Sequence, residues 1–162
     1  MNKILTIFAL CVCIVVAGCS KGPKKPKDLP KLNPTTITVL YDDGTPVEGA
    51  TVVLRLAQST GGRTWNVVGQ SDATGKAVLK TDANWEGVPA GEYEGMVTKE
   101  VADVEKAKEL GGSDVVKSIT RFVAVKYSNP HDSGLKASVT DGGENAFEFK
   151  VGEKIEENVD VM

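Results

Sequence analysis

The sequence predicts an all-β protein, an antiparallel sandwich of about seven strands with one short helical insertion. Apolar and polar residues alternate in several short runs, which is the pattern of strands with one buried face. Turn-forming pairs such as Asp43-Gly44 and Gly61-Gly62 separate these runs. Aromatic residues make up only 6% of the chain, so Val, Leu, Ile and Ala must supply most of the core.

An export signal is predicted ahead of the sandwich. The chain begins with Met1-Asn2-Lys3, and residues 4–16 are apolar apart from Thr6. As a helix this apolar segment would reach about 20 Å, less than the roughly 30 Å of a bilayer's hydrocarbon core. We therefore expect residues 1–18 to be a signal peptide that is removed from the mature protein.

The stretch Val16-Ala17-Gly18-Cys19 resembles the bacterial lipobox, in which an aliphatic residue, a small residue and Gly or Ala precede a Cys. The resemblance implies cleavage after Gly18, a diacylglycerol on the sulfur of Cys19 and an N-acyl chain such as palmitate on its new amine. The mature protein would then be exported and anchored in a membrane of the cell envelope. Because Ser20 follows where inner-membrane lipoproteins often carry Asp, the outer membrane is favoured wherever the organism has one. An ordinary secretory signal with an incidental Cys is the alternative.

The predicted cleavage also limits the cysteine chemistry of the mature protein. The chain has three cysteines, and Cys11 and Cys13 would leave with the signal peptide. The lipid would occupy Cys19. The mature domain would therefore hold no disulfide, no thiolate metal ligand and no Cys nucleophile.

Residues 19–34 are predicted to be the lipidated cysteine and a tether. Four prolines and five lysines lie among residues 20–34, a composition that excludes a helix or a central strand. We expect an extended spacer of about 3.1 Å per residue. Its lysines can pair with anionic lipid headgroups, at about 1 kcal/mol each near such a surface, or can simply keep the tether soluble.

The rest of the chain is acidic. Residues 35–162 hold 13 Lys and Arg against 21 Asp and Glu, a net charge of −8. A surface of this sign repels phosphate backbones. Nucleic acid is therefore excluded as an expected partner.

The predicted sandwich spans residues 35–152. Its strands are expected at residues 36–41, 50–56, 64–71, 77–81, 92–97, 119–127, 135–139 and 147–151. Residues 129–134 are expected to form a loop between two of these strands. The segment 153–162 is an acidic tail that we expect to fray.

The helical insertion is predicted within residues 100–118. Val101, Val104, Ala107 and Leu110 recur there at helical spacing, and Gly111-Gly112 would end the helix. The segment is longer than a simple connection between strands. It is either one short amphipathic helix or an insertion that carries one.

Three stretches of the sandwich share the pattern of a known family. They are Asp43-Gly44-Thr45-Pro46-Val47-Glu48-Gly49-Ala50-Thr51-Val52, Asp72-Ala73-Thr74-Gly75-Lys76 and Gly87-Val88-Pro89-Ala90-Gly91-Glu92-Tyr93. They resemble the carboxypeptidase regulatory-like, or transthyretin-like, domain. The stretches Lys126-Tyr127-Ser128-Asn129-Pro130, Ser133-Gly134-Leu135 and Asn145-Ala146-Phe147-Glu148-Phe149 are similar to small exported lipoproteins of planctomycetes built on that domain. The resemblance implies an Ig-like or prealbumin-like sandwich with an accessory role, and Ala77 departs from it where the family has Phe or Tyr.

We expect no catalytic residues. His131 is the only histidine, and on an extended loop its neighbour Asp132 would point away from it, so the two form no nucleophile–base pair. Glu92 and Glu94 share one face of a predicted strand, about 6–7 Å apart at Cα. Exposed glutamates of this kind are far commoner than an acid–base pair. The chain is therefore expected not to be an enzyme and to hold no cofactor other than its covalent lipid.

Two kinds of binding site remain as candidates. The acidic turns of Asp42, Asp43 and Asp72 offer oxygen ligands of the type that calcium prefers, but they lack the fixed spacing of the twelve-residue calcium loop. Trp65 and Trp85 can stack on a sugar or a peptide, or can pack in the core. The expected function is a non-enzymatic envelope lipoprotein with an envelope protein or polysaccharide as partner. The alternative is a calcium- or carbohydrate-binding lipoprotein.

Overall fold

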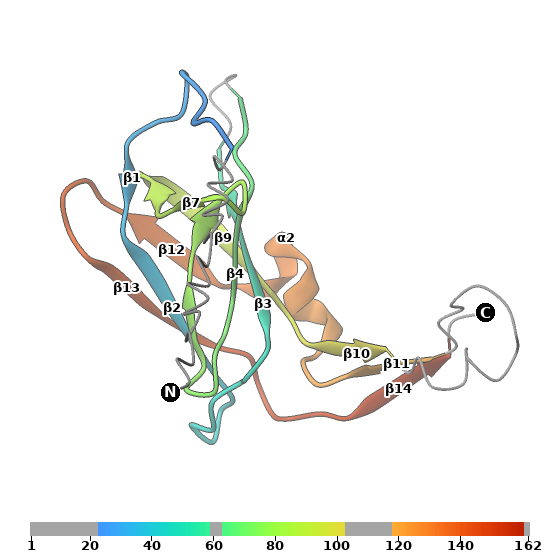
Figure 1. The fold of residues 1–162 in the computed structure, drawn as a ribbon. Helices are drawn as coiled ribbons and strands as arrows, with labels where there is room; N and C mark the ends of the chain where they lie inside the picture. Colours follow the sequence, from blue (N-terminus) through green and yellow to red (C-terminus); the bar gives the residue numbers. More distant parts are fainter. Residues whose placement is uncertain (1–22, 59–62, 103–117, 161–162) are drawn as a thin grey trace, which may run out of the picture.

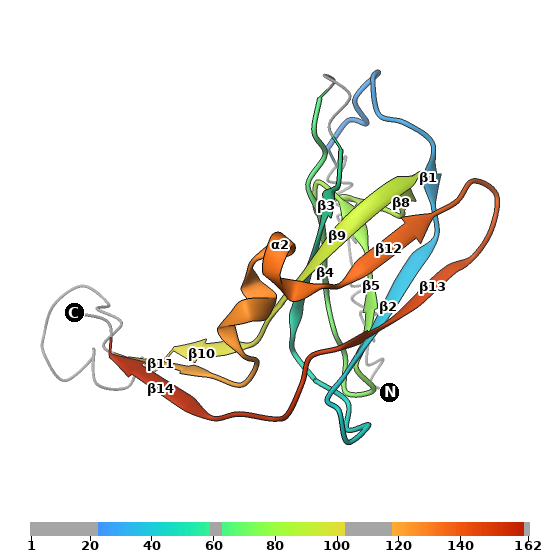
Figure 2. The ribbon, with the colours of Figure 1, turned by 180° about the vertical axis from the view of Figure 1, so that it is seen from behind.

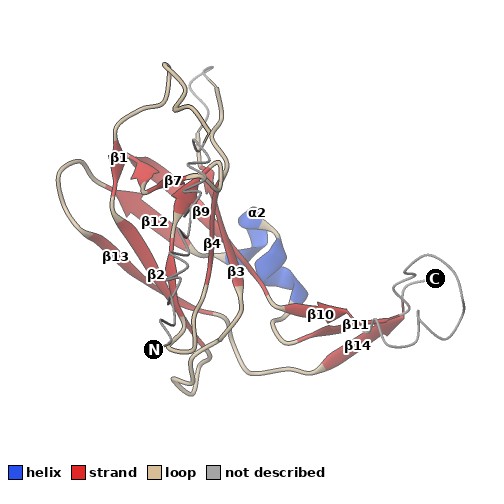
Figure 3. Cartoon of the chain, in the orientation of Figure 1, coloured by secondary structure: helices blue, strands red, loops and turns tan. Residues whose placement is uncertain are grey.

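The computed structural model describes residues 23–58, 63–102 and 118–160. Strands dominate this part of the chain, and its helical segments are short (Figure 3). Nine of the strands form two facing sheets with apolar side chains between them, and the others form two smaller sheets. The predicted all-β sandwich is confirmed. The predicted signal peptide and lipidation site, Gly18 and Cys19 included, lie outside the described residues.

The first sheet of the sandwich is antiparallel and has the strand order β12-β9-β3-β4-β6-β7. Its strands are β3 (Thr51–Leu56), β4 (Val67–Gln70), β6 (Lys80–Thr81), β7 (Trp85–Glu86), β9 (Gly91–Thr98) and β12 (Lys136–Val139). The longest strand, β9, pairs with both β3 and β12. Tyr93 and Val97 of β9 are buried and Glu92 is exposed, which confirms the predicted facing.

The second sheet has the order β13-β2-β5 and contains one parallel pair. Its strands are β2 (Thr35–Leu40), β5 (Lys76–Val78) and β13 (Asn145–Lys150). The turn after β12 carries the chain across to this sheet at the end where β2 begins, and Asn145 lies opposite Thr35. β13 therefore runs alongside β2 in the same direction, whereas the sequence indicated antiparallel pairing throughout.

The segment from β5 to β6 joins the two sheets. β5 pairs with β2 in the second sheet, and β6 pairs with β4 in the first. This crossing presses the chain against Gly69 of β4. A Cβ at Gly69 would lie 2.6 Å from Cδ2 of Leu79 and 2.8 Å from the carbonyl oxygen of Val78. Only glycine allows the two backbones to approach this closely.

Alternate residues of both sheets form the core. Phe149 is its largest fully buried side chain, and aliphatic residues supply most of the rest, as the low aromatic content predicts. The other large apolar side chains that are fully buried are Ile37, Val39, Val47, Val52, Leu54, Val67, Leu79, Val88, Val97 and Val151. Ala77 is also fully buried, whereas Trp85 is half-buried and lies outside the core cluster.

A smaller sheet, here called the arm, projects from the sandwich (Figures 1 and 2). It has the order β10-β11-β14 and consists of β10 (Glu100–Ala102), β11 (Ser118–Arg121) and β14 (Glu157–Asp160). β10 follows β9 directly in the chain, after Thr98. The expectation that the acidic tail frays is wrong for β14, which pairs with β11 over four residues. Strand pairing recruits a segment whose composition alone favours solvent.

The described helical segments lie outside the predicted insertion. Residues 103–117, the centre of that insertion, are outside the described part, and β10 and β11 flank them. A 3-10 helix, η1 (Val125–Ser128), and a short helix, α2 (Pro130–Ser133), follow instead. The strand expected at 119–127 thus ends at Arg121, and the expected loop contains α2. Asn129 caps α2 by accepting a bond from the backbone N–H of His131 at 3.0 Å, so the stretch that we expected to be a loop contains a helix start.

The last residues of the predicted tether belong to the fold. β1 (Leu32–Asn33) pairs with β8 (Val88–Pro89), immediately before β9 begins. We call this end of the sandwich the tether end. The opposite end, where β2 finishes and β9 passes into the arm, is the far end.

Candidate binding groove at the tether end

A groove of about 310 Å³ opens at the tether end. Its walls come from five separate parts of the chain: the tether, the end of β3, the segment before β4, the stretch from β8 to the start of β9, and the turn before β13. The lining residues are Pro30, Lys31, Leu56, Arg63, Thr64, Trp65, Pro89, Ala90, Tyr93 and Asp141. An apolar floor with a few charged side chains at the rim is typical of sites that bind small ligands or headgroups.

Trp65 forms one wall of the groove and is held by Arg63. The guanidinium carbon of Arg63 lies 4.1 Å from the centre of the Trp65 ring, within the range of a cation–π contact. Arg63 also pairs with Asp28 of the tether and with Asp82 before β7, each at 3.5 Å. These three contacts fix Trp65 in a half-buried position and attach the tether to the groove.

Tyr93 forms part of the groove's floor. Its hydroxyl donates a hydrogen bond to the carbonyl oxygen of Pro89 at 2.9 Å. Burial disfavours the phenolate and raises the pKa of Tyr93 to about 12. The side chain therefore stays neutral at physiological pH, where it shapes the groove and does not act as a base.

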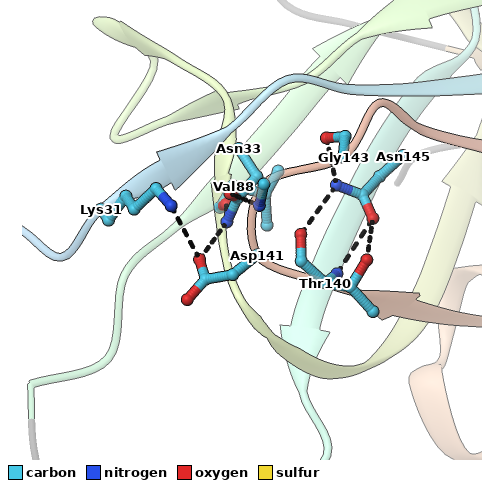
Figure 4. A network of polar contacts seen from close by, with 8 residues as sticks. Lys31, Asn33, Val88, Thr140, Asp141, Gly143 and Asn145 are labelled. Atoms are coloured by element: carbon cyan, nitrogen blue, oxygen red, sulfur yellow. Dashed lines mark hydrogen bonds and ion pairs between the residues drawn. The ribbon is translucent and has the colours of Figure 1, made fainter.

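A polar network positions Asp141 at the rim (Figure 4). The amide of Asn33 donates to Oδ1 of Asp141 at 3.2 Å and to the carbonyl oxygen of Val88 at 3.4 Å. Lys31 approaches the same carboxylate at 3.8 Å. Asn33 is buried, and the backbone N–H of Gly142 satisfies its side-chain oxygen at 3.2 Å. The tether, β8 and the turn before β13 are thereby joined around one carboxylate.

The two tryptophans proposed as a stacking surface do not share a site. Trp65 lines the groove, whereas Trp85 lies on β7 at the edge of the first sheet and is not among the lining residues. The other groove residues were missed in the sequence. Lys31, Arg63 and Asp141 come from segments up to about a hundred residues apart, and no local pattern marks them as neighbours.

The proposed calcium ligands lie at the far end, where the carboxylates of Asp43 and Asp72 accept hydrogen bonds from backbone N–H groups. Oδ1 of Asp72 accepts bonds from the Thr74 hydroxyl and from the backbone N–H groups of Thr74 and Lys76. These bonds lower the pKa of Asp72. The backbone N–H of Thr45 donates a hydrogen bond to Oδ1 of Asp43 at 2.8 Å and lowers the pKa of Asp43. Both are Asx turns, which form for backbone reasons. Within the described ranges, no group of three His, Cys, Asp or Glu side chains is placed to hold a metal ion. Asp42 therefore belongs to no such group.

Of the residues that we set aside as catalysts, His131 and Glu94 meet on the surface, whereas Glu92 has a different partner. His131 Nδ1 lies 3.4 Å from a carboxylate oxygen of Glu94, and Ser138 donates a hydrogen bond to Glu92. The His131 side chain is 72% exposed, so this contact lies in water. The pair lies outside the residues that line the groove.

Comparisons with protein-family models, with curated proteins and with solved structures each find no match to this chain. In the part of the chain that the structure describes, no helix is long and apolar enough to cross a membrane. The fold and the groove thus define a β-sandwich with one candidate ligand site at the tether end and a projecting arm.

Proposed function

We propose that this protein is a lipid-anchored, non-enzymatic module of the cell envelope that holds a partner protein at a distance from the membrane. The observation that supports the proposal is the placement of tether and arm at opposite ends of β9. Tyr93 of β9 lines the groove beside the tether, and Thr98 precedes the arm. The strand's rise of about 3.3 Å per residue separates its two ends by roughly 23 Å. With Cys19 in a membrane, the arm would face away from it.

The arm has the properties of a surface that binds an extended segment. β10 and β14 are its two edge strands, and among the described residues no further strand pairs with either. Edge strands of this kind offer free backbone donors and acceptors to another chain. Val101 of β10 is 54% exposed, and its side chain would gain burial on pairing. A partner protein that adds a strand to β10 is the simplest occupant.

Membrane anchoring is tested first, with Cys19→Ser in the native host. We expect the variant to leave the membrane fraction, because two or three acyl chains are lost and each buried CH₂ contributes about 0.8 kcal/mol. Ser20→Ala is the matched control and should stay membrane-bound. Retention of the Cys19→Ser protein in membranes would contradict the lipobox assignment.

Partner binding is tested with a photo-activated cross-linking residue at Val101 on the arm. We expect a specific cross-linked protein that is absent when the same residue replaces Lys150 of β13. A Val101→Lys substitution should abolish the cross-link from a second probe at Thr120, because a charge would be placed in the paired edge. Equal cross-linking from Val101 and Lys150 would count against the arm as the binding surface.

The groove supports a second candidate function, carbohydrate binding. A half-buried Trp beside charged and hydroxyl-bearing groups can stack on a sugar ring. Titration of the mature protein with envelope glycans should quench or shift tryptophan fluorescence through Trp65. The change should persist in a Trp85→Phe variant and disappear in Trp65→Phe. No change with any glycan would remove this candidate. The far-end aspartates give calcium binding no comparable support.

A further inference from the structure

We propose that the tether end of the sandwich docks on an anionic bilayer surface, with the Trp65 groove seated against the lipid headgroups. The proposal rests on the lipid anchor at Cys19. It goes beyond anchoring, because a flexible tether alone would leave the domain free to tumble above the membrane. Three independent observations support a fixed orientation.

The first observation is the length of chain between the anchor and the fold. Pro23, where the described chain begins, follows Cys19 by four residues. A fully extended chain covers at most about 3.6 Å per residue, so Pro23 lies within roughly 14 Å of the Cys19 Cα. From Pro23 the tether runs to the groove, where Pro30 and Lys31 line the wall. The lipid therefore holds this end of the sandwich close to the headgroups.

The second observation is the attachment of the tether to the sandwich. Asp28 pairs with Arg63, Lys31 approaches Asp141, and β1 pairs with β8. Two exposed ion pairs contribute little on their own. Together with the strand pairing and the buried side chain of Asn33, they limit rotation of the sandwich about its tether. The anchor therefore restricts the orientation of the sandwich relative to the membrane.

The third observation is the distribution of charge between the two ends. Lys24, Lys25 and Lys27 are exposed at the tether end, and no carboxylate in the described ranges lies within ion-pair distance of them. The far end instead exposes acidic side chains in its turns, with Lys76 and Lys154 near them. The far-end acidic residues are Asp42, Asp43, Glu48 and Asp72. The tether end also exposes Asp28 and Asp141, which pair with Arg63 and Lys31, and Glu144. Its attraction to an anionic surface therefore comes from the three lysines outside these pairs.

The groove itself is suited to the headgroup layer. Trp and Tyr are enriched at membrane–water interfaces, where the ring meets apolar chains and the polar edge meets water. Trp65 is half-buried under Arg63, so its stack presents a cation and an aromatic edge at the same rim. A phosphate-bearing headgroup would pair with Arg63 and Lys31 and place its glycerol against the apolar lining.

The test uses the lipidated mature protein reconstituted in vesicles. Cleavage removes two cysteines and the lipid occupies the third, so an introduced cysteine is the only thiol available for a fluorescent label. Thr64→Cys places the label on the groove wall, and Glu48→Cys places it at the far end; both positions are exposed. Quenching by acrylamide, a neutral quencher, then reports how far each label is shielded from water.

On vesicles of equal parts phosphatidylglycerol and phosphatidylcholine, we expect the Thr64 label to be shielded and the Glu48 label to remain open. On phosphatidylcholine alone both should be open. Shielding should weaken between about 0.1 M and 1 M salt, because the Debye length falls from about 10 Å to about 3 Å. Equal quenching of the two labels on anionic vesicles would overturn the proposal.

A triple variant separates docking from anchoring. Replacing Lys24, Lys25 and Lys27 by Gln should lower the ratio of docked to undocked protein by about fivefold per lysine, while flotation with the vesicles is unchanged. Glu48→Gln is the control and should have no effect. Loss of flotation would instead contradict the lipid anchor of the proposed function. Full shielding in the triple variant would contradict docking through these lysines. Shielding produced by a soluble glycan without anionic lipid would assign the groove to another ligand.

Discussion

The sandwich and the arm are built from the same kind of strand but held together differently. The sandwich buries almost every inward side chain, with Ile37, Val39 and Val151 at 0% exposure. In the arm all the side chains are half-buried or exposed. Apolar burial therefore stabilises the sandwich, whereas the arm depends on backbone pairing and the ion pair of Arg121 with Glu100 at 2.9 Å. Sequence changes in the arm should affect binding more than folding.

The comparison predicts its largest effect at Phe149, in the core of the sandwich. Phe149→Ala should lower the free energy of unfolding by about 3–5 kcal/mol, because it removes the largest buried side chain and leaves a cavity. Val101→Ala in the arm should change it by no more than about 0.5 kcal/mol. Urea denaturation of the mature protein measures both. Similar losses in the two variants would mean that the arm and the sandwich fold as one unit.

A second variant tests how tightly the sandwich core is packed. A Cβ at Gly95 would lie 2.5 Å from Cε2 of Phe149, so Gly95→Ala should cost about 1–3 kcal/mol. Phe149→Leu in the same chain should recover part of that loss, which a double-mutant cycle detects. Gly143→Ala is the matched control, since the nearest atom to its Cβ is 3.9 Å away. Additive losses would show that Phe149 does not cause the cost.

A smaller effect is expected in the arm. Arg121→Gln removes the ion pair with Glu100, two side chains that are 27% and 43% exposed, and should cost about 0.2–1 kcal/mol. Amide hydrogen exchange should then accelerate in β10 and remain unchanged in β9. Arg55→Gln on β3 is the control, because Arg55 forms no ion pair with any described residue. Faster exchange in both strands would mean that the arm supports the sandwich.

The smallest effect concerns the acidic turns of the far end. The Thr74 hydroxyl and neighbouring backbone N–H groups favour the Asp72 carboxylate in the folded state and lower its pKa. Because the folded pKa lies below the unfolded value of about 3.9, this contribution is present at neutral pH and is lost as pH falls through the folded pKa. Asp72→Asn should therefore flatten the acid side of the stability curve. Urea unfolding across the acid pH range measures the effect, with the unchanged chain as the reference.

Local pattern was sufficient for the sandwich strands. Alternation placed Ile37 and Val39 inside β2 and Tyr93 and Val97 inside β9, because a side-chain period of two determines which face is buried. Turn residues such as Asp43-Gly44 marked the breaks for the same local reason. Alternation did not distinguish the strand β11 from the helical turn around Tyr127, since apolar residues recur at short intervals through both segments.

The groove could not be predicted in the same way. It needs Lys31, Arg63, Tyr93 and Asp141 side by side, and their neighbourhood results from β1 pairing with β8 and from the Asn33 network. Of the candidate binding residues, only Trp65 reached the groove. The proposed calcium ligands were chosen by residue type, and the structure shows the side-chain oxygens of Asp43 and Asp72 bonded to backbone N–H groups.

The sequence by itself determined the all-β class, the inward faces of the main strands and the predicted anchor at Cys19, because each depends on residues within a few positions of one another. The tertiary structure alone decided the parallel pairing of β13 with β2, the recruitment of the acidic segment 157–160 into the arm, and the groove. These features depend on contacts between distant segments, whose formation reflects the packing of the whole chain and leaves no periodic signal.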